Sequence, residues 1–301
     1  MLFAILSGCQ NKILHKDSRI AMGTTVEVIS PDKRAAAVAF AEIKRIEDLL
    51  SKYKQDSEIS RLNRLGKLNV SSDTLYIIKD AKKFWLASDG AFDVTVGPLM
   101  DIWGFTDKVC KLPNKSKVTE TLKLVGFDKV VIEETNRQIK FRLAGMKVDL
   151  GAIAKGYSVD CAVKKLKEAG INSCLINAGG DIYCLGDKFG KPWNVAIQNP
   201  RGKDVITYLQ LKDKAVATSG DYEQYFIKRH KRYAHIFNPK TGYPADSGVI
   251  SATVIASDCT TADALATSIF VLGKQAGEKL AKKFLGVEVK IIEEGNVSRN
   301  Q

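Results

Sequence analysis

Apolar positions follow helical spacing in some segments and strand spacing in others. Ala39, Ile43, Ile46 and Leu50 recur at helical spacing and predict a helix from Pro31 to about Tyr53, with proline at its start. Comparable patterns predict helices over 73–87, 117–125, 151–170, 261–271 and 274–285. Strands are predicted at 19–30, 129–134, 138–143, 147–150, 173–177, 182–185, 193–198, 205–211, 249–256 and 287–292. Helices interrupt the strands irregularly, which predicts an α+β fold with mixed or antiparallel sheets.

Polar residues mark the ends of these segments. Ser72 is expected to cap the helix that starts at 73, and Asp258 or Thr260 the helix that starts at 261. The sequence Asn238-Pro239-Lys240-Thr241-Gly242 predicts a tight turn. No G-x-G-x-x-G or Walker A sequence occurs, so the common nucleotide-binding folds lack support.

The chain divides into a short leading segment and one domain. With 301 residues, 45% of them hydrophobic, and no long linker or short-period repeat, residues 19–301 are expected to share one core. In residues 1–18, an apolar stretch ends in Leu6-Ser7-Gly8-Cys9, which has the form of a lipobox, and Gln10–Lys16 has the polarity of a tether. No basic residue precedes the apolar stretch, so an apolar end with an incidental cysteine is the alternative. Since no segment reaches membrane-spanning length, the prediction is a lipid anchor at Cys9.

Charge and cysteine content narrow the possible partners. The net charge is +12, but the lysines are scattered apart from one dense run, Lys228–Arg232, which aromatic residues flank. No nucleic-acid motif surrounds it, so we expect a solvated hairpin turn and no nucleic-acid partner. None of the cysteines forms a C-x-x-C pair or shows zinc-ligand spacing, so they predict no zinc or redox centre.

A candidate anion-binding site lies where a predicted strand runs into a helix. Asp149 ends the strand-like segment, and Lys155 falls within the first turns of the helix. The free N–H groups and the dipole of a helix N-terminus attract phosphate, and Gly151 and Gly156 permit close approach. An ordinary strand–helix junction with a solvated lysine explains these residues equally well.

A candidate metal site lies on the helix predicted at 261–271. Asp263 and Thr267 are four residues apart and therefore share one helix face. A carboxylate and a hydroxyl suit Mg²⁺, which takes one or two protein carboxylates and completes its shell with waters and phosphates. A capping, solvent-facing pair is the alternative.

One of the three histidines, His235, lies between aromatic residues and the 238–242 turn. There it is suited to bind a substrate or move a proton, and a structural role is the alternative.

Taken together and in order, these segments resemble the ApbE-type flavin transferases over residues 19–292. The resemblance rests on eight ordered blocks: Met22-Gly23-Thr24, Ser51–Asn63, Gly90–Asp93, Val148–Tyr157, Asn177–Asp181, Thr218–Tyr222, His235–Pro244 and Ala262–Thr267. It implies a T-fold-like α+β architecture with an FAD-binding cleft between two subregions. It also implies that FAD is split and its FMN half is joined to a threonine or serine hydroxyl of a partner protein, with release of AMP.

The resemblance also implies roles for matching residues. The expected FAD-lining residues are Met22, Tyr53, Ala91, Phe92, Asp93, Asp149, Lys155 and the His235-Ile236 segment, with His235 handling a proton. The expected Mg²⁺ ligands are Asp263, Thr267 and the backbone carbonyl of Ala152. Some members of the family carry an acidic residue in place of Lys155, so this lysine is expected to tune the reaction.

The resemblance implies a class of acceptor protein and not an individual one. Family acceptors carry an Asp-x-x-Thr/Ser-Gly-Ala-like motif and are often subunits of membrane redox complexes, which agrees with export as a lipoprotein. Two alternatives stay open: an FAD pyrophosphatase that releases FMN and AMP, and a non-catalytic FAD-binding lipoprotein.

Overall fold

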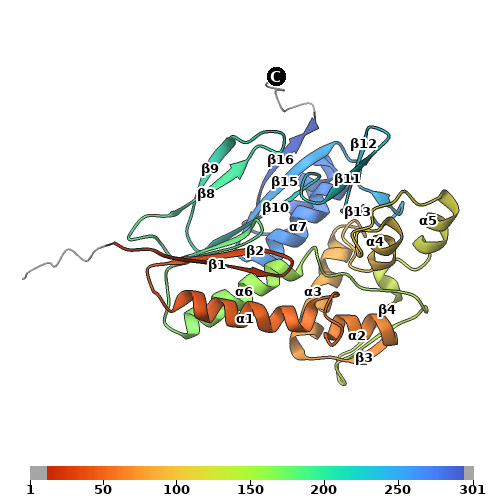
Figure 1. Ribbon diagram of the computed structural model, residues 1–301, viewed down its shortest axis with the longest axis horizontal. Coiled ribbons are helices and arrows are strands. Elements are labelled where there is room, and N and C mark those ends of the chain that lie inside the picture. Colours follow the sequence, from red (N-terminus) through yellow and green to blue (C-terminus); the bar gives the residue numbers. More distant parts are fainter. Residues whose placement is uncertain (1–11, 295–301) are drawn as a thin grey trace, which may run out of the picture.

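The computed structural model describes residues 12–294, which form a seven-stranded antiparallel sheet covered on one face by helices (Figure 1). The strand order is β1-β2-β6-β7-β10-β15-β16, so strands distant in the sequence are neighbours. These strands are β1 (His15–Ala21), β2 (Thr24–Ser30), β6 (Cys174–Ala178), β7 (Asp181–Leu185), β10 (Lys214–Gly220), β15 (Val249–Ala256) and β16 (Glu288–Glu293). The predicted α+β class is therefore confirmed.

Three helices form the layer that packs against this sheet: α1 (Ala35–Leu50), α6 (Ala154–Glu168) and α7 (Cys259–Leu272). Helix α7 contacts β10 and β15, and α6 packs between α1 and α7. Apolar side chains at helical spacing, including Ile43 and Ile46 of α1 and Leu265 and Ile269 of α7, are fully buried in this core. The remaining helices are α2 (Glu58–Leu65), α3 (Ser72–Ala87), α4 (Gly97–Trp103), α5 (Lys115–Leu122) and α8 (Lys274–Ala281), with a 3₁₀ turn at Phe127–Lys129.

Smaller sheets complete the fold. A three-stranded sheet has the order β3-β5-β4. The pair β8–β9 covers the sheet face opposite the helices through a core that includes Trp193, Val195 and Leu211. The pairs β11–β12 and β13–β14 lie beside α4, where Trp103 and Phe237 are buried in another core. Their bounds are β3 (Lys67–Asn69), β4 (Val130–Glu133), β5 (Gln138–Phe141), β8 (Trp193–Gln198), β9 (Val205–Leu211), β11 (Tyr225–Lys228), β12 (Lys231–Ala234), β13 (Phe237–Asn238) and β14 (Tyr243–Pro244).

Several predicted elements differ from the structure. The segment predicted as one strand, 19–30, forms parts of two strands, β1 and β2, joined by a turn at Met22-Gly23. Ser71, not Ser72, caps α3, because its hydroxyl accepts the amide hydrogen of Thr74. Segment 147–150 forms only one bridge, between Lys147 and Val96, because the Asn63 side chain bonds both the amide and the carbonyl of Val148. The Asn63 side chain thus bonds the backbone groups of Val148 that would otherwise pair with a neighbouring strand.

The N-terminal prediction is only partly covered by the described residues. Strand β1 begins at His15, inside the segment predicted to be a tether. Cys9 and the lipobox lie outside the described residues. Within residues 12–294, no helix is both long and apolar enough to cross a bilayer.

Candidate active site

The site forms where the N-terminal end of α6 crosses that of α7. A Cβ atom at Gly156 would lie 2.4 Å from the carbonyl oxygen of Cys259, so only glycine permits this approach. The Asp160 carboxylate then accepts the amide hydrogens of Cys259 and Thr260, each at 2.8 Å, and the Thr260 hydroxyl at 2.5 Å. Asp258 caps α7 by accepting the amide hydrogen of Thr261, so of the two predicted caps, Asp258 and Thr260, the first is confirmed. The two helix starts are therefore held together by hydrogen bonds.

This crossing brings Lys155 and Asp263 together. The Lys155 ammonium lies 2.8 Å from Asp181 Oδ2 and 3.5 Å from Asp263 Oδ2. The Gly156 amide donates to Asp263 Oδ2 at 3.2 Å. The sequence prediction of a solvated lysine is therefore ruled out, because Lys155 lies between two buried carboxylates.

The cluster contains more carboxyl groups than basic groups. Burial, and then the charge of nearby Asp263, raise the pKa of Asp181 well above its ordinary value. Burial alone would lower the pKa of Lys155, but Asp181 and Asp263 outweigh it and the pKa of the ammonium is raised. Glu223 also faces the cluster: its residue surface is largely exposed, yet crowding of its carboxyl by protein atoms and the charge of Asp263 raise its pKa to about 7. The carboxyls outnumber the single lysine, which favours binding of a further cation.

The proposed metal ligands fit Mg²⁺ chemically. Asp263 is buried, and Thr267 Oγ1 lies 3.1 Å from Ser219 Oγ on the same side of α7. Ala152 lies in the turn before α6; an α-helical bond would join its carbonyl to the Gly156 amide, but that amide donates to Asp263 instead. Residues 12–294 contain no group of three or more His, Cys, Asp and Glu placed to hold a metal. Mg²⁺ needs few protein ligands, because waters and phosphates complete its shell.

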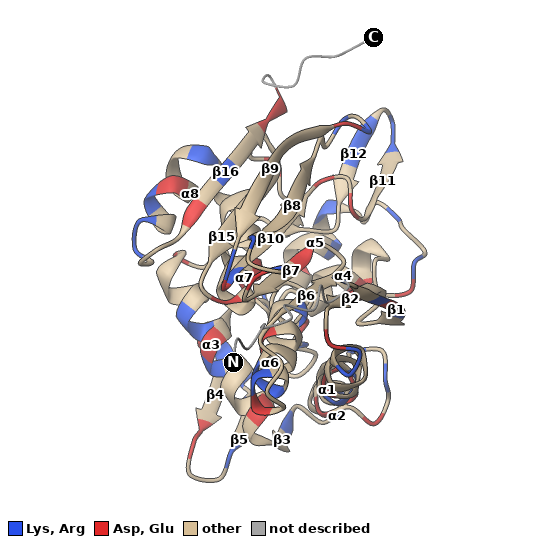
Figure 2. Cartoon of the chain, turned by 90° about the vertical axis from the view of Figure 1, so that its left-hand side faces the viewer, with Lys and Arg blue, Asp and Glu red and all other residues tan. Residues whose placement is uncertain are grey.

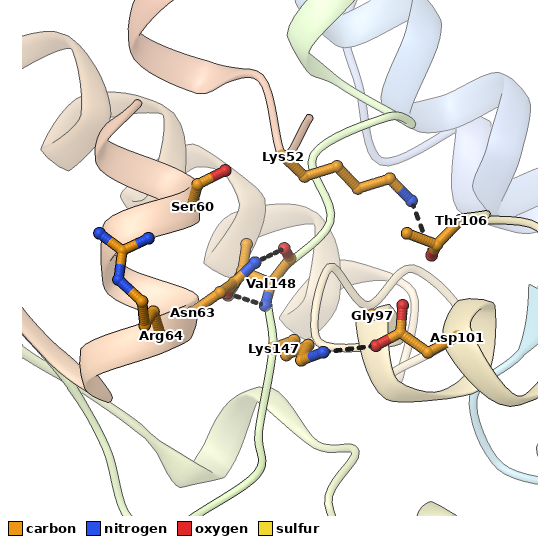
Figure 3. A pocket seen from close by; sticks show the side chains of 9 residues that line it. All are labelled: Lys52, Ser60, Asn63, Arg64, Gly97, Asp101, Thr106, Lys147 and Val148. Carbon is orange, nitrogen blue, oxygen red and sulfur yellow. Dashed lines mark hydrogen bonds and ion pairs between the residues drawn. The ribbon is translucent and has the colours of Figure 1, made fainter. Parts of the chain in front are cut away.

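Asp149 is already engaged within the protein. Its Oδ1 accepts the Gly151 amide at 2.9 Å, and its Oδ2 lies 2.5 Å from the Lys52 ammonium. Lys52 lines a pocket of about 350 Å³ between α2 and α4 and reaches toward Thr106 (Figure 3). Burial opposes the charge on Lys52, but Asp149 outweighs it and raises the pKa of the ammonium. Asp149 therefore both orders the loop before α6 and holds the Lys52 ammonium in place.

His235 is a neutral imidazole at the base of the β11–β12 hairpin. Burial, reinforced by the charge of Lys155, lowers its pKa to about 4. Its Nδ1 lies 3.2 Å from the Gln224 carbonyl oxygen, which can only accept a hydrogen bond. The ring proton therefore belongs on Nδ1, which leaves the Nε2 lone pair free to accept a proton.

The other predicted FAD-lining residues divide into surface and core positions. Tyr53 is exposed, with its ring 5.0 Å from the Lys52 ammonium. Met22 has a positive φ of 53° in the β1–β2 turn, and its amide donates to Glu47. Ala91, Phe92 and Ile236 are buried in the main core.

Asp93 also has an internal role. Its two oxygens accept hydrogen bonds from Thr95 and from the Phe127 amide, and burial raises the pKa of its carboxyl. These bonds fix the orientation of the Asp93 carboxyl within the protein.

The sequence analysis assigned no role to Lys52, Asp181 and Glu223. Lys52 and Asp181 lie inside two of the blocks that resemble the family, and Glu223 directly follows the Thr218–Tyr222 block. This position in or next to a block was the sign in the sequence that they could have a role. Nothing in their spacing shows that they approach Lys155 or Asp149. Their roles depend on contacts between residues far apart in the chain.

Comparison with known proteins now identifies the family. The ApbE family model matches residues 22–291. The chain belongs to the ApbE family. It is 34% identical to the FAD:protein FMN transferase of Haemophilus influenzae, over 92% of this chain and 86% of that protein, and 32% identical to the one of Treponema pallidum, over 91% and 83%.

Solved ApbE structures share the fold. The ApbE protein of Thermotoga maritima superposes with a TM-score of 0.88 at 37% identity, covering 95% of this chain and 96% of that one. The flavin transferase ApbE of Vibrio cholerae gives 0.84 at 31% identity, covering 93% and 94%. The expected ApbE architecture is confirmed over nearly the whole chain.

Proposed function

We propose that this protein is a Mg²⁺-dependent FAD:protein FMN transferase that joins FMN through its phosphate to a threonine or serine hydroxyl of a partner protein and releases AMP. The observation that carries the proposal is the buried Lys155–Asp181–Asp263 cluster beside neutral His235, in a chain whose relatives bear this name. The expected partner is a membrane redox-complex subunit with an Asp-x-x-Thr/Ser-Gly-Ala-like motif.

Lys155 and the start of α6 are suited to bind the FAD pyrophosphate. The lysine is held charged by Asp181 and Asp263, and the first amides of α6 carry the positive end of the helix dipole. These groups are fixed before substrate arrives, so they stabilise negative charge that develops on the departing AMP without reorganisation.

Asp263, Thr267 and the Ala152 carbonyl would hold the Mg²⁺, whose excess positive charge offsets the carboxyls of the cluster. When bound, this ion supplies charge neutralisation at the two phosphates of FAD.

His235 is suited to accept the proton of the incoming hydroxyl. The hydroxyl oxygen bonds to the phosphorus on the FMN side, the bond from that phosphorus to the bridging oxygen breaks, and AMP leaves with the bridging oxygen. The hydroxyl proton passes to Nε2 of His235, the nitrogen that the Gln224 contact leaves free. A hydroxyl on a docked protein is aligned for this attack, whereas water must be excluded.

The deciding experiment combines FAD, Mg²⁺ and a peptide that bears the acceptor motif, followed by intact-mass analysis. The expected result is a peptide that gains the mass of FMN less water, with equimolar AMP and no product in EDTA. AMP and free FMN with an unmodified peptide would establish a pyrophosphatase instead. Bound but uncleaved FAD would establish a storage protein.

Asp263→Asn tests the metal site in the same assay. It should abolish Mg²⁺-dependent AMP release, because the amide removes an anionic ligand while keeping the size of the side chain. Thr261→Ala, on the same helix and outside the cluster, is the matched control and should keep wild-type release. If Asp263→Asn releases AMP at the wild-type rate, the metal does not bind on α7.

A further inference from the structure

The β11–β12 hairpin ends in a turn whose residues are conformationally unfavourable. Lys228 pairs with Lys231, so Arg229 and His230 form a two-residue turn, and both have positive φ angles, 51° and 61°. Asn-Gly normally fills such a turn, because other residues are strained with positive φ. The predicted hairpin turn is confirmed, but folding alone does not explain why these bulky side chains occupy it.

Part of the charge on this hairpin has no partner. Tyr225–Ala234 contains four cations and no carboxylate. Lys231 pairs with Asp246 at 2.7 Å, and Arg232 with Asp221 at 3.2 Å. Within residues 12–294, neither Lys228 nor Arg229 forms an ion pair, and both are exposed. Figure 2 shows the blue Lys and Arg segments on this projecting hairpin.

The hairpin is fixed at its base and open on its outer face. On the inner face, the rings of Phe226 and Tyr233 stack with their centroids 5.1 Å apart, and both pack against Trp103. On the outer face, Tyr225 and Ile227 are 42% and 62% exposed. The exposed apolar side chains on the outer face and the unpaired cations at the turn together make the hairpin suited to bind a partner.

The hairpin also leads directly into the candidate active site. His235 follows β12, and its amide donates to the Gln224 carbonyl just before β11. At about 3.3 Å per residue, the four residues of each strand place the turn roughly 13 Å from His235. A polypeptide whose hydroxyl reaches His235 can cover that distance with about four extended residues.

We propose that the β11–β12 hairpin docks the protein acceptor by binding an acidic segment that flanks the modified hydroxyl. The inference rests on the proposed function, which requires a protein at this site. A polypeptide is favoured over a lipid surface because its reacting hydroxyl and its acidic segment must be joined at the distance that separates His235 from the turn. Attraction between the cations and that segment raises the association rate and orients the acceptor.

Binding of two fluorescent peptides tests the docking surface directly. Both share a threonine-containing centre with the acceptor motif, and one carries a run of glutamates about four residues from the threonine where the other carries glutamines. In EDTA, so that no transfer occurs, anisotropy should show the glutamate peptide binding roughly tenfold more tightly at low ionic strength. Added salt should remove the difference.

Charge reversal assigns this preference to the turn. Lys228→Glu/Arg229→Glu should abolish the preference for the glutamate peptide, while AMP release from FAD alone stays at the wild-type level. Lys279→Glu/Lys282→Glu changes the net charge equally and should retain the preference. Lys279 is on α8 and Lys282 directly follows this helix, and α8 lies across the molecule from the hairpin in Figure 2.

Several outcomes would overturn docking at the hairpin. Equal binding of the two peptides to the wild-type protein is one, and a preference that survives in Lys228→Glu/Arg229→Glu is another. If sedimentation with phosphatidylserine–phosphatidylcholine vesicles depends on Lys228 and Arg229 while peptide binding does not, the surface serves a membrane instead. Failure of FMN transfer to either peptide would refute the proposed function and leave the binding comparison to decide the docking.

Discussion

At the scale of single residues, Glu223 makes the stability of the protein depend on pH. Crowding of its carboxyl by protein atoms, together with the charge of Asp263, raises its pKa from 4.5 to about 7, so the folded protein binds this proton more tightly than the unfolded chain does. The stabilisation is complete below pH 4.5 and is lost as pH rises through 7. Relative to Glu223→Gln, the wild-type free energy of unfolding should therefore fall across this interval.

Urea denaturation in EDTA at several pH values measures this effect. Asp160, whose pKa burial raises to about 6, is present in both proteins, so its titration cancels in the comparison. Parallel pH dependences of the two proteins would show that Glu223 does not titrate in this interval.

The proposed proton transfer to His235 leads to a second prediction for a single residue. His235→Gln removes the proton acceptor, so kcat for FMN transfer should fall roughly 10²- to 10⁴-fold. The affinity for FAD, measured by flavin fluorescence, should change little, because a glutamine amide can keep the contact with the Gln224 carbonyl. A full transfer rate in this variant would exclude His235 from proton transfer.

The sequence indicates which residues have suitable chemistry for the site better than it indicates which of them are in contact. The sequence drew attention to Lys155 and Asp263, because a lysine early in one helix and a carboxylate in another are visible as patterns. Their approach depends on Gly156, whose missing side chain lets α6 touch α7, and on Asp160. No spacing rule shows a contact between residues more than a hundred positions apart. The ion pair of Lys52 with Asp149 was missed for the same reason.

At the scale of elements, Asp160 joins α6 to α7. Its ionised carboxylate accepts the two first amides of α7, so Asp160→Ala should lower the free energy of unfolding by about 2 kcal/mol at pH 8. Asp160→Asn should cost less, since the amide oxygen still accepts one of these bonds. Urea denaturation tests the order of the two variants, and equal stability of alanine variant and wild type would contradict it.

Elements with clear apolar spacing were predictable, whether long or short. Helix α7 and strands β8, β9 and β15 lie where their apolar spacing predicts, and so do the short strands β4 and β5. Helices α2 and α4 were missed, and α4 begins with Gly97-Pro98, which is typical of a turn. Segment 147–150 has strand-like spacing, but a single asparagine side chain replaces its strand partner. Local pattern could not reveal that replacement.

At the scale of the whole molecule, we propose that the protein is exported and lipidated at Cys9. Produced with a complete export signal, it should partition with membranes, and Cys9→Ser should move it to the soluble exported fraction, because the acyl anchor is lost. Cell fractionation measures the shift. Equal membrane retention of both forms would exclude lipidation at this residue.

The crossing of α6 over α7 also has a mechanical consequence. No side chain separates Gly156 from Cys259, and three hydrogen bonds to Asp160 bridge the helices, so their N-terminal ends form one rigid unit. Lys155 and Asp263 belong to this unit and cannot separate unless these hydrogen bonds break. A movement that encloses a ligand would therefore have to come from segments outside this unit, while Lys155 and Asp263 keep their relative positions.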